Sequence, residues 1–300
     1  MPRFAANLSL MYTEMPFLDR FEAAHEDGFK YIECLFPYAH EQDVLLKKIK
    51  GNQLQQVLIN TPPGGSEAHE AQRMWDVGMR GVACLPGKEQ EFEQGFRLAL
   101  QYAKALECSQ IHVMAGCVPE PYQLAQNQTQ RLATSSTLAQ VPGPLLETYL
   151  SNLYKAANWA KEEGVNVLIE PINTRDIPHY FLNHQAHAHQ IVQTLGLSNV
   201  KVQMDLYHCQ IVEGDLIEKI KHYLPLAQVG HLQVAGVPLR QELQFGELNY
   251  IDIFKVLDEV AQACSWRGFV GLEYRPREGA DAGGTSRGLA WLKSSVNWLD

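Results

Sequence analysis

The sequence predicts an α/β protein, folded as a single closed (β/α)8 barrel of the TIM type over residues 1–300. Two observations carry this prediction. Short apolar, strand-like segments alternate along the whole chain with longer segments of helical periodicity, which favours parallel βα units. Eight such units can be counted and no linker divides them, so one barrel accounts for the chain. Barrels of this type carry their active sites at the carboxyl ends of the strands.

The strand-like segments are apolar runs, and we place them at 4–10, 31–37, 55–61, 111–116, 166–172, 200–205, 231–236 and 269–274. The clearest helical patterns lie at 17–28, 96–107, 145–164 and 250–264. Gly28 and Gly164 stand where a glycine commonly ends a helix. Pro16 suits the first turn of a helix.

Two long connections, at about 62–88 and 117–142, follow the third and fourth strands. Both leave the expected catalytic end of the barrel, so we predict that they shape the entrance to the site. The second is rich in Gln, Ser and Thr. For this one, a lid and a mobile insertion remain equal alternatives.

Composition limits the class of partner. The formal net charge is −9, from 25 Lys and Arg against 34 Asp and Glu, without a basic block, which argues against nucleic acid. A small anionic substrate remains compatible if a metal or a few arginines reverse the local sign. The six cysteines are scattered without a C-x-x-C pair, so we expect buried, reduced thiols.

Nothing in the sequence indicates a membrane or an export signal. The N-terminal region lacks a long apolar core and carries Glu14 and Asp19 early. No run approaches the roughly 20 apolar residues of a membrane span. We therefore expect a cytoplasmic protein without a membrane partner, and the sequence leaves a homo-oligomer open.

Four consecutive strands in the second half of the chain end in a side chain with a metal-binding oxygen. These residues are Glu170, Asp205, Gln233 and Glu273. Because the carboxyl ends of parallel strands meet at one end of a barrel, the four predict an oxygen-rich pocket suited to Mg²⁺ or Mn²⁺. The two glutamates could also act as a general acid and a general base facing each other.

Further polar residues next to these strands are candidates for binding substrate. His208 lies three residues after Asp205 and could bind or polarise a substrate oxygen. Arg240 and Arg275 lie just past the last two strands, and arginine can hold a carboxylate with two parallel hydrogen bonds. For each arginine, a solvated surface position is the open alternative.

The first four strands supply weaker candidates. Asn7 and Asn60 could orient substrate oxygens, and Phe36 could form an apolar wall. His112 could contact substrate or pack. His231 should lie deeper in the barrel, as a packing residue or behind the ligands.

A run of three histidines, His184, His187 and His189, looks like a metal cluster by composition. The i, i+3, i+5 spacing does not place all three on one face of a helix. We predict a solvated helix start instead.

Nine ordered motifs give the chain a resemblance to a known family. They are ANLSLMYTE at 6–14, FPY at 36–38, NTPPG at 60–64, HVMAG at 112–116, EPIN at 170–173, QMDLYHCQ at 203–210, HLQVAG at 231–236, GELNY at 246–250 and GLEYRPR at 271–277. Together they resemble the hydroxypyruvate isomerases, within the xylose-isomerase-like TIM barrels.

This resemblance implies interconversion of hydroxypyruvate and tartronate semialdehyde (2-hydroxy-3-oxopropanoate) through an enediolate. It places the family's two acid–base glutamates on Glu170 and Glu273. It places the family's metal ligands on Glu170, Asp205, Gln233 and Glu273. The implied partner is a small anionic oxo-acid.

The chain departs from the family at its entrance loops, which look longer, and at QELQF (241–245), which lacks the usual Gly/Pro-rich character. Substrate size therefore stays open, with 2-oxo-tetronate isomerase or a ketose 3-epimerase-like sugar isomerase as the alternative. A metal-dependent nuclease and a silent binding protein are further classes. The negative charge argues against the first, and the intact set of ligands against the second.

Overall fold

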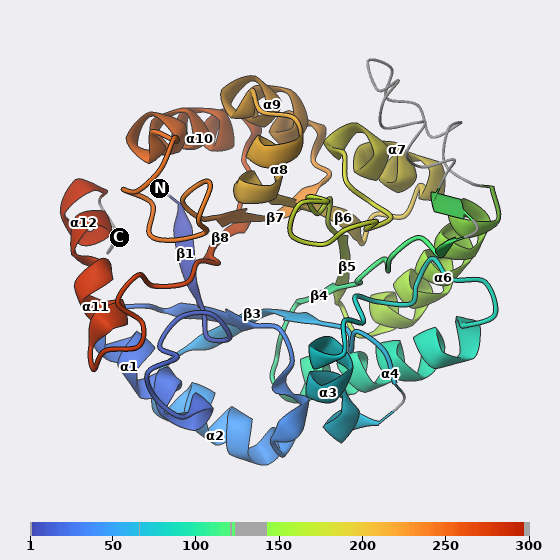
Figure 1. Ribbon diagram of the computed structural model, residues 1–300, viewed down its shortest axis with the longest axis horizontal. Coiled ribbons are helices and arrows are strands. Elements are labelled where there is room, and N and C mark those ends of the chain that lie inside the picture. The colour runs from blue at the N-terminus through green and yellow to red at the C-terminus, as the bar shows by residue number, and fades with distance from the viewer. Residues whose placement is uncertain (1, 66, 121, 124–142, 297–300) are drawn as a thin grey trace.

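The computed structural model describes residues 2–65, 67–120, 122–123 and 143–296, and it confirms the closed parallel barrel (Figure 1). Each strand pairs in parallel with the next along the chain, and β8 closes the ring against β1. The strands are β1 (Arg3–Asn7), β2 (Tyr31–Cys34), β3 (Gln55–Asn60), β4 (Gln110–His112), β5 (Asn166–Ile169), β6 (Val200–Asp205), β7 (Val229–Val234) and β8 (Phe269–Leu272).

Helices surround the barrel (Figure 1). The α-helices are α1 (Arg20–Glu26), α2 (Gln42–Gly51), α3 (Ala71–Asp76), α4 (Glu89–Ala105), α6 (Gly143–Glu162), α7 (Gln185–Leu195), α8 (Leu206–Val212), α9 (Leu216–Tyr223), α10 (Tyr250–Cys264), α11 (Gly284–Gly288) and α12 (Ala290–Ser295). Short 3-10 helices lie at η1 (Phe17–Asp19), η2 (Pro37–Ala39), η3 (Ala68–Glu70) and η5 (Leu224–Leu226).

All eight expected strands are present, but most are shorter than the apolar runs that predicted them. The runs continue past the strand ends, where Leu8, Thr61 and Val113 still donate backbone hydrogen bonds to the next segment. The first long connection contains η3 and α3, which the sequence did not predict. Most of the second connection lies outside the described residues.

The barrel interior changes character along its axis. A small apolar cluster includes Ala5 of β1, Val57 of β3, Leu168 of β5 and Phe269 of β8. β1, β3 and β5 are not neighbours in the ring, so their contacts cross the interior. Nearer the carboxyl ends the buried side chains are polar, including Glu33, Gln203, His231 and Gln233. Most buried polar groups have hydrogen-bond partners, so a whole layer of them indicates a built site.

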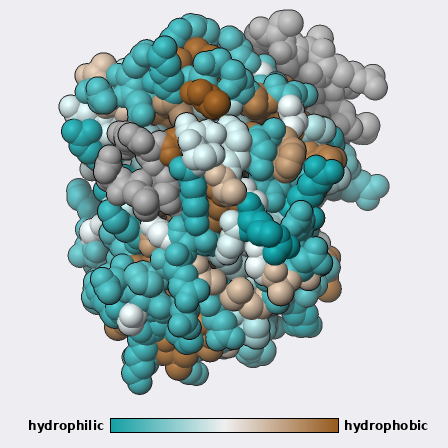
Figure 2. All heavy atoms as spheres, turned by 90° about the vertical axis from the view of Figure 1, so that its left-hand side faces the viewer, coloured by the Kyte–Doolittle hydropathy of each residue, from teal (hydrophilic) through white to brown (hydrophobic). Residues whose placement is uncertain are grey.

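The outside of the molecule is ordinary for a globular protein. Figure 2 shows one side on which hydrophilic residues dominate and hydrophobic ones form small, separated patches. None of the helices in the described part of the chain has the length and apolar character needed to cross a membrane. All six cysteines are free thiols, and Cys34, Cys84, Cys108 and Cys209 are buried.

The expectation for the histidine run was wrong at one position. His184 directly precedes α7, as predicted for a helix start. His189, however, is buried, where its ring stacks on Tyr223 at 4.0 Å and its Nδ1 pairs with Gln228 at 2.8 Å. The sequence spacing excluded a helix face shared by all three histidines. It could not show that α9 packs against His189.

Candidate active site

A cavity of about 960 Å³ opens at the carboxyl ends of the strands. Glu170 and Glu273, which follow β5 and β8 directly, both line it. His112, His208 and Arg240 also contribute to its wall. The structure therefore brings both predicted acid–base glutamates into one pocket.

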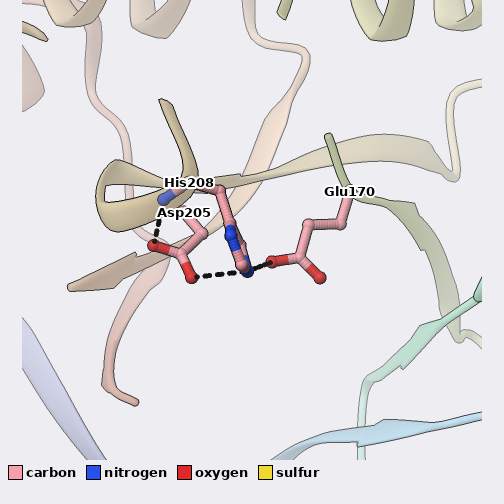
Figure 3. Close-up of side chains that lie close together, drawn as sticks. All are labelled: Glu170, Asp205 and His208. Atoms are coloured by element: carbon pink, nitrogen blue, oxygen red, sulfur yellow. Dashed lines mark hydrogen bonds and ion pairs between the residues drawn. The ribbon is translucent and has the colours of Figure 1, made fainter. Parts of the chain in front are cut away.

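Asp205 owes its position to an abrupt change of structure, because β6 ends at this residue and α8 begins at the next. Its Oδ1 caps the helix by accepting from the N–H groups of Tyr207 (2.7 Å) and His208 (3.4 Å). This cap orients the start of α8 toward the pocket. His208 Nε2 then lies 3.5 Å from Asp205 Oδ2 and 3.9 Å from Glu170 Oε1 (Figure 3).

The hydrogen bonds to His208 assign its tautomer. Its Nδ1 accepts from the backbone N–H of Asn173 (3.4 Å) and lies 2.7 Å from Asn173 Nδ2, and both of these are donors. The shorter contact, at Nδ1, places the proton of the neutral ring on Nε2, which faces the carboxylates and also lies 3.4 Å from Arg240 Nη2. Burial, Arg240 and His112 hold the pKa of His208 well below its usual value, so the ring is neutral.

Glu170 is poised to carry a proton. Burial, followed by the charges of Glu273 and Asp205, raises its pKa well above the ordinary value. Its Oε1 is buried without a hydrogen-bond partner among the described residues. His112 Nδ1 lies 3.5 Å from its other oxygen, and burial lowers the pKa of His112 to about 3.

Glu273 pairs with Arg240. The guanidinium Nη2 lies 2.6 Å from Glu273 Oε2 and 3.4 Å from Asp205 Oδ2. Burial raises the pKa of Glu273 to about 8, against the opposing effect of Arg240. Burial alone would lower the pKa of Arg240, but Glu273, Asp205 and Glu170 raise it, so the guanidinium stays charged.

The donor set fits a hard divalent cation in part. One oxygen each of Glu170 and Asp205 and one nitrogen of His208 lie within 4.8 Å of one another. The unpartnered Glu170 Oε1 would be satisfied by an ion there. The other two predicted ligands are engaged, Glu273 by Arg240 and Gln233 by Gln203, whose Nε2 donates to Gln233 Oε1 at 2.6 Å.

The remaining predicted site residues differ in whether they line the cavity. Asn60, Phe36 and Arg275 line the cavity, and the Arg275 side chain is exposed. Asn7 is buried beneath it instead, where its Nδ2 donates to Glu33 Oε1 (3.0 Å) and Glu273 Oε1 (3.4 Å).

Sequence reasoning missed several residues of the site. Glu33 stands in β2 between apolar neighbours and is 1% exposed, close to His231, Gln233 and Asn7. A charge inside an apolar strand was the available signal, because such groups are buried only when paired. Arg277, just past β8, also lines the cavity, and so do Arg20 and Trp75, from segments without any strand-end pattern.

Comparisons with known proteins agree with the fold. Residues 21–295 match the family described as "Xylose isomerase-like TIM barrel". The chain is 46% identical to 2-oxo-tetronate isomerase from Cupriavidus necator over 98% of both chains. It is 35% identical to hydroxypyruvate isomerase from Escherichia coli strain K12, over 97% of this chain and 98% of that protein. The crystal structure of AP endonuclease, family 2 from Brucella melitensis superposes with a TM-score of 0.81, at 41% identity, covering 98% of this chain and 99% of that one.

The chain therefore belongs to the xylose isomerase-like TIM-barrel family. Its curated relatives bear the names of isomerases, and the match covers nearly their full length. Within the family, this protein is an isomerase.

Proposed function

We propose that this isomerase interconverts hydroxypyruvate and tartronate semialdehyde through an enediolate, with Glu170 and Glu273 as the acid–base pair. The observation that carries the proposal is a single pocket lined by two buried carboxyl groups whose pKa values are both raised. Groups of this kind can be protonated or ionised near neutral pH, which acid–base catalysis requires.

In this mechanism one carboxylate removes a proton from the hydroxymethyl carbon of hydroxypyruvate, and the electron pair forms an enediolate. The opposite carboxyl group returns a proton to the former carbonyl carbon. The hydroxyl proton passes to the other oxygen, which leaves an aldehyde beside a secondary alcohol. Each glutamate ends in the protonation state in which the other began, so the reverse reaction uses the same pair.

His208 and Arg240 supply positive or polarised hydrogens for the charge that develops. The Nε2–H of His208 points to the space between Glu170 and Asp205, and Arg240 Nη2 lies 3.4 Å from that nitrogen. Glu170 and Asp205, with His208 beside them, would hold Mg²⁺ or Mn²⁺, which would supply Lewis-acid stabilisation of the oxygens. Gln233 and Glu273 are the further ligands that we propose.

The charge around the cavity supports an anionic substrate. Among the described residues that line it, Glu170 and Glu273 are the only acids, whereas four arginines line it. These are Arg20, Arg240, Arg275 and Arg277. A protein of net charge −9 thus has a locally basic mouth, which favours an oxo-acid over a neutral sugar.

The basic residues also indicate how the substrate is oriented. Arg275 and Arg277 follow β8 and Arg20 begins α1, so they stand on the β8–β1 side of the ring. Glu170 follows β5, which lies opposite β1 in a closed ring of eight. We propose that the carboxylate points toward Arg240 and Arg275, with Asn60 and His112 beside the oxygens.

The second candidate is 2-oxo-tetronate isomerisation, which uses the same chemistry on one more carbon. Two observations favour it: the 46% identical relative bears that name, and the cavity of about 960 Å³ exceeds what a three-carbon acid fills.

The compartment that we propose is the cytoplasm.

Proton NMR with the purified protein tests the proposal. Hydroxypyruvate, 2-oxo-tetronate and a ketohexose are offered separately in D2O, with and without added Mg²⁺ or Mn²⁺. We expect an aldehyde or the isomeric oxo-acid to form, with deuterium entering at the carbon that gains hydrogen. Turnover of the ketohexose alone would replace the proposal with an epimerase, and cleavage of abasic DNA by the same preparation with a nuclease.

A further inference from the structure

A buried carboxylate that no part of the mechanism uses lies at the centre of the polar interior. Glu33 is 1% exposed and belongs to β2, where its neighbour across the ladder is Asn7 of β1. The space that it occupies exists because residue 271 of β8 is glycine. A Cβ at Gly271 would lie 2.4 Å from Glu33 Oε2 and 2.5 Å from Oε1, which is closer than atoms can pack.

Three side chains lie within hydrogen-bonding distance of this carboxylate. Oε1 accepts from Asn7 Nδ2 at 3.0 Å and from Gln233 Nε2 at 2.8 Å. Oε2 lies 2.7 Å from His231 Nε2. A carboxylate can accept about four hydrogen bonds, and bonds to a charged acceptor are the strong ones. Glu33 therefore fixes which end of each amide faces it.

The two amides extend this network away from Glu33, and the amide of Asn7 reaches a site glutamate. The same Nδ2 of Asn7 donates to Glu273 Oε1 at 3.4 Å, while Asn7 Oδ1 accepts from the N–H of Ser9 at 3.0 Å. Gln233, with its Nε2 on Glu33, turns its Oε1 to Gln203 Nε2 at 2.6 Å.

We propose that Glu33 is a positioning residue for the active site. Its carboxylate orients the amides of Asn7 and Gln233, and through them it holds Glu273 and the oxygen of Gln233 in place. Glu33 does not line the cavity, so it acts only through these neighbours. The role assigned to the two glutamates rests on the proposed function, whereas the orientation of the amides does not.

The isosteric variant Glu33→Gln removes the charge and keeps the shape. A carboxamide has a single oxygen for three donors, so its NH2 must face one of them. Rotation of Asn7 would then turn its oxygen toward the Glu273 carboxylate, and rotation of Gln233 would turn its NH2 toward that of Gln203. We expect kcat and the affinity for Mn²⁺ each to fall about 10–100-fold, the usual effect of losing a partner behind a ligand, while KM changes little.

Gly271→Ala tests the position of the Glu33 carboxylate and leaves its charge in place, because the added Cβ displaces both oxygens. The matched control is Gly230→Ala on β7, whose Cβ would meet Leu168 Cδ2 and Lys201 Cβ at 2.9 Å and does not reach Glu33. The control should lower the melting temperature yet leave kcat per folded molecule and Mn²⁺ affinity unchanged. Equal losses of both quantities in Gly230→Ala and Gly271→Ala would show that the effect is crowding, and would overturn the proposal.

Neutron diffraction from crystals of the deuterated wild-type protein decides the question without a variant. We expect deuterium on Asn7 Nδ2 and Gln233 Nε2 facing Glu33, and none on Glu33. An amide oxygen facing Glu33, or a folded Glu33→Gln protein with normal kcat and Mn²⁺ affinity, overturns the proposal. If the wild type turns over neither hydroxypyruvate nor 2-oxo-tetronate, the proposed function fails, while the neutron map still decides the role of Glu33.

Discussion

At the scale of single residues, several buried carboxyl groups of the site lie around one guanidinium group. Asp205 and Glu273 contact Arg240, and Glu170 contacts histidines that are neutral. The residues at the ends of apolar runs could be predicted from sequence, because a charge that interrupts such a run is visible. The charge of Glu33 inside an apolar strand is visible too, but its role could not be predicted, because its partners Gln233 and His231 lie about 200 residues away along the chain.

The two glutamates give the first prediction. Glu170→Gln and Glu273→Gln should each lower turnover by at least about 100-fold, the scale on which a general acid or base acts. The amide keeps the shape and cannot exchange a proton. Glu213→Gln is the control, since Glu213 caps Gln185 away from the cavity. Steady-state kinetics of folded proteins is the measurement, and near-normal turnover in either site variant contradicts the mechanism.

Stability of the metal-free protein should depend on pH through Glu273. Its pKa rises from 4.5 to about 8 on folding because of burial. Between these values the folded state binds more protons than the unfolded state, so stability must fall as pH rises. The contribution is complete below about pH 4.5 and is lost as pH passes about 8. Melting temperatures across this range should fall in wild type and fall less in Glu273→Gln, and parallel curves would count against this assignment.

At the scale of elements, the strands and their order follow from the apolar runs that alternate with helical patterns. The segment of η3 and α3 did not follow, because short helices in a long loop leave no periodic pattern. Its position depends on tertiary contacts instead. The ring of Trp75 lies 5.5 Å from that of Phe36, and the guanidinium of Arg80 lies 3.7 Å from the Trp75 ring.

This segment forms part of the outer wall of the cavity, through His69, Gln72 and Trp75 among others. Trp75→Ala should therefore raise KM several-fold with little change in kcat, and more for 2-oxo-tetronate than for hydroxypyruvate, because only the longer acid reaches the wall. Val77→Ala is the control, since Val77 caps the same helix and is 70% exposed. An equal effect on both substrates would show that α3 does not select for length.

At the scale of the whole molecule, closure of the ring is what creates the site. Glu170, Asp205 and Glu273 are separated by tens of residues along the chain and meet only because β5, β6 and β8 end at the same rim. The unfolded chain cannot offer these oxygens together. Any cation that uses them therefore binds the folded state and stabilises the whole barrel by mass action.

This linkage predicts that Mn²⁺ or Mg²⁺ raises the melting temperature of chelator-treated protein. At a free concentration 100 times Kd, the gain in free energy of unfolding should be about 2.7 kcal/mol. Asp205→Asn should abolish most of it, because the amide lacks the charge that a hard cation needs. Asp252→Asn, on the exposed first turn of α10, is the control for general effects of salt. If the cation raises the melting temperatures of Asp205→Asn and Asp252→Asn equally, the ion binds elsewhere. The cluster of Glu170, Asp205 and His208 then binds substrate oxygens through hydrogen bonds alone.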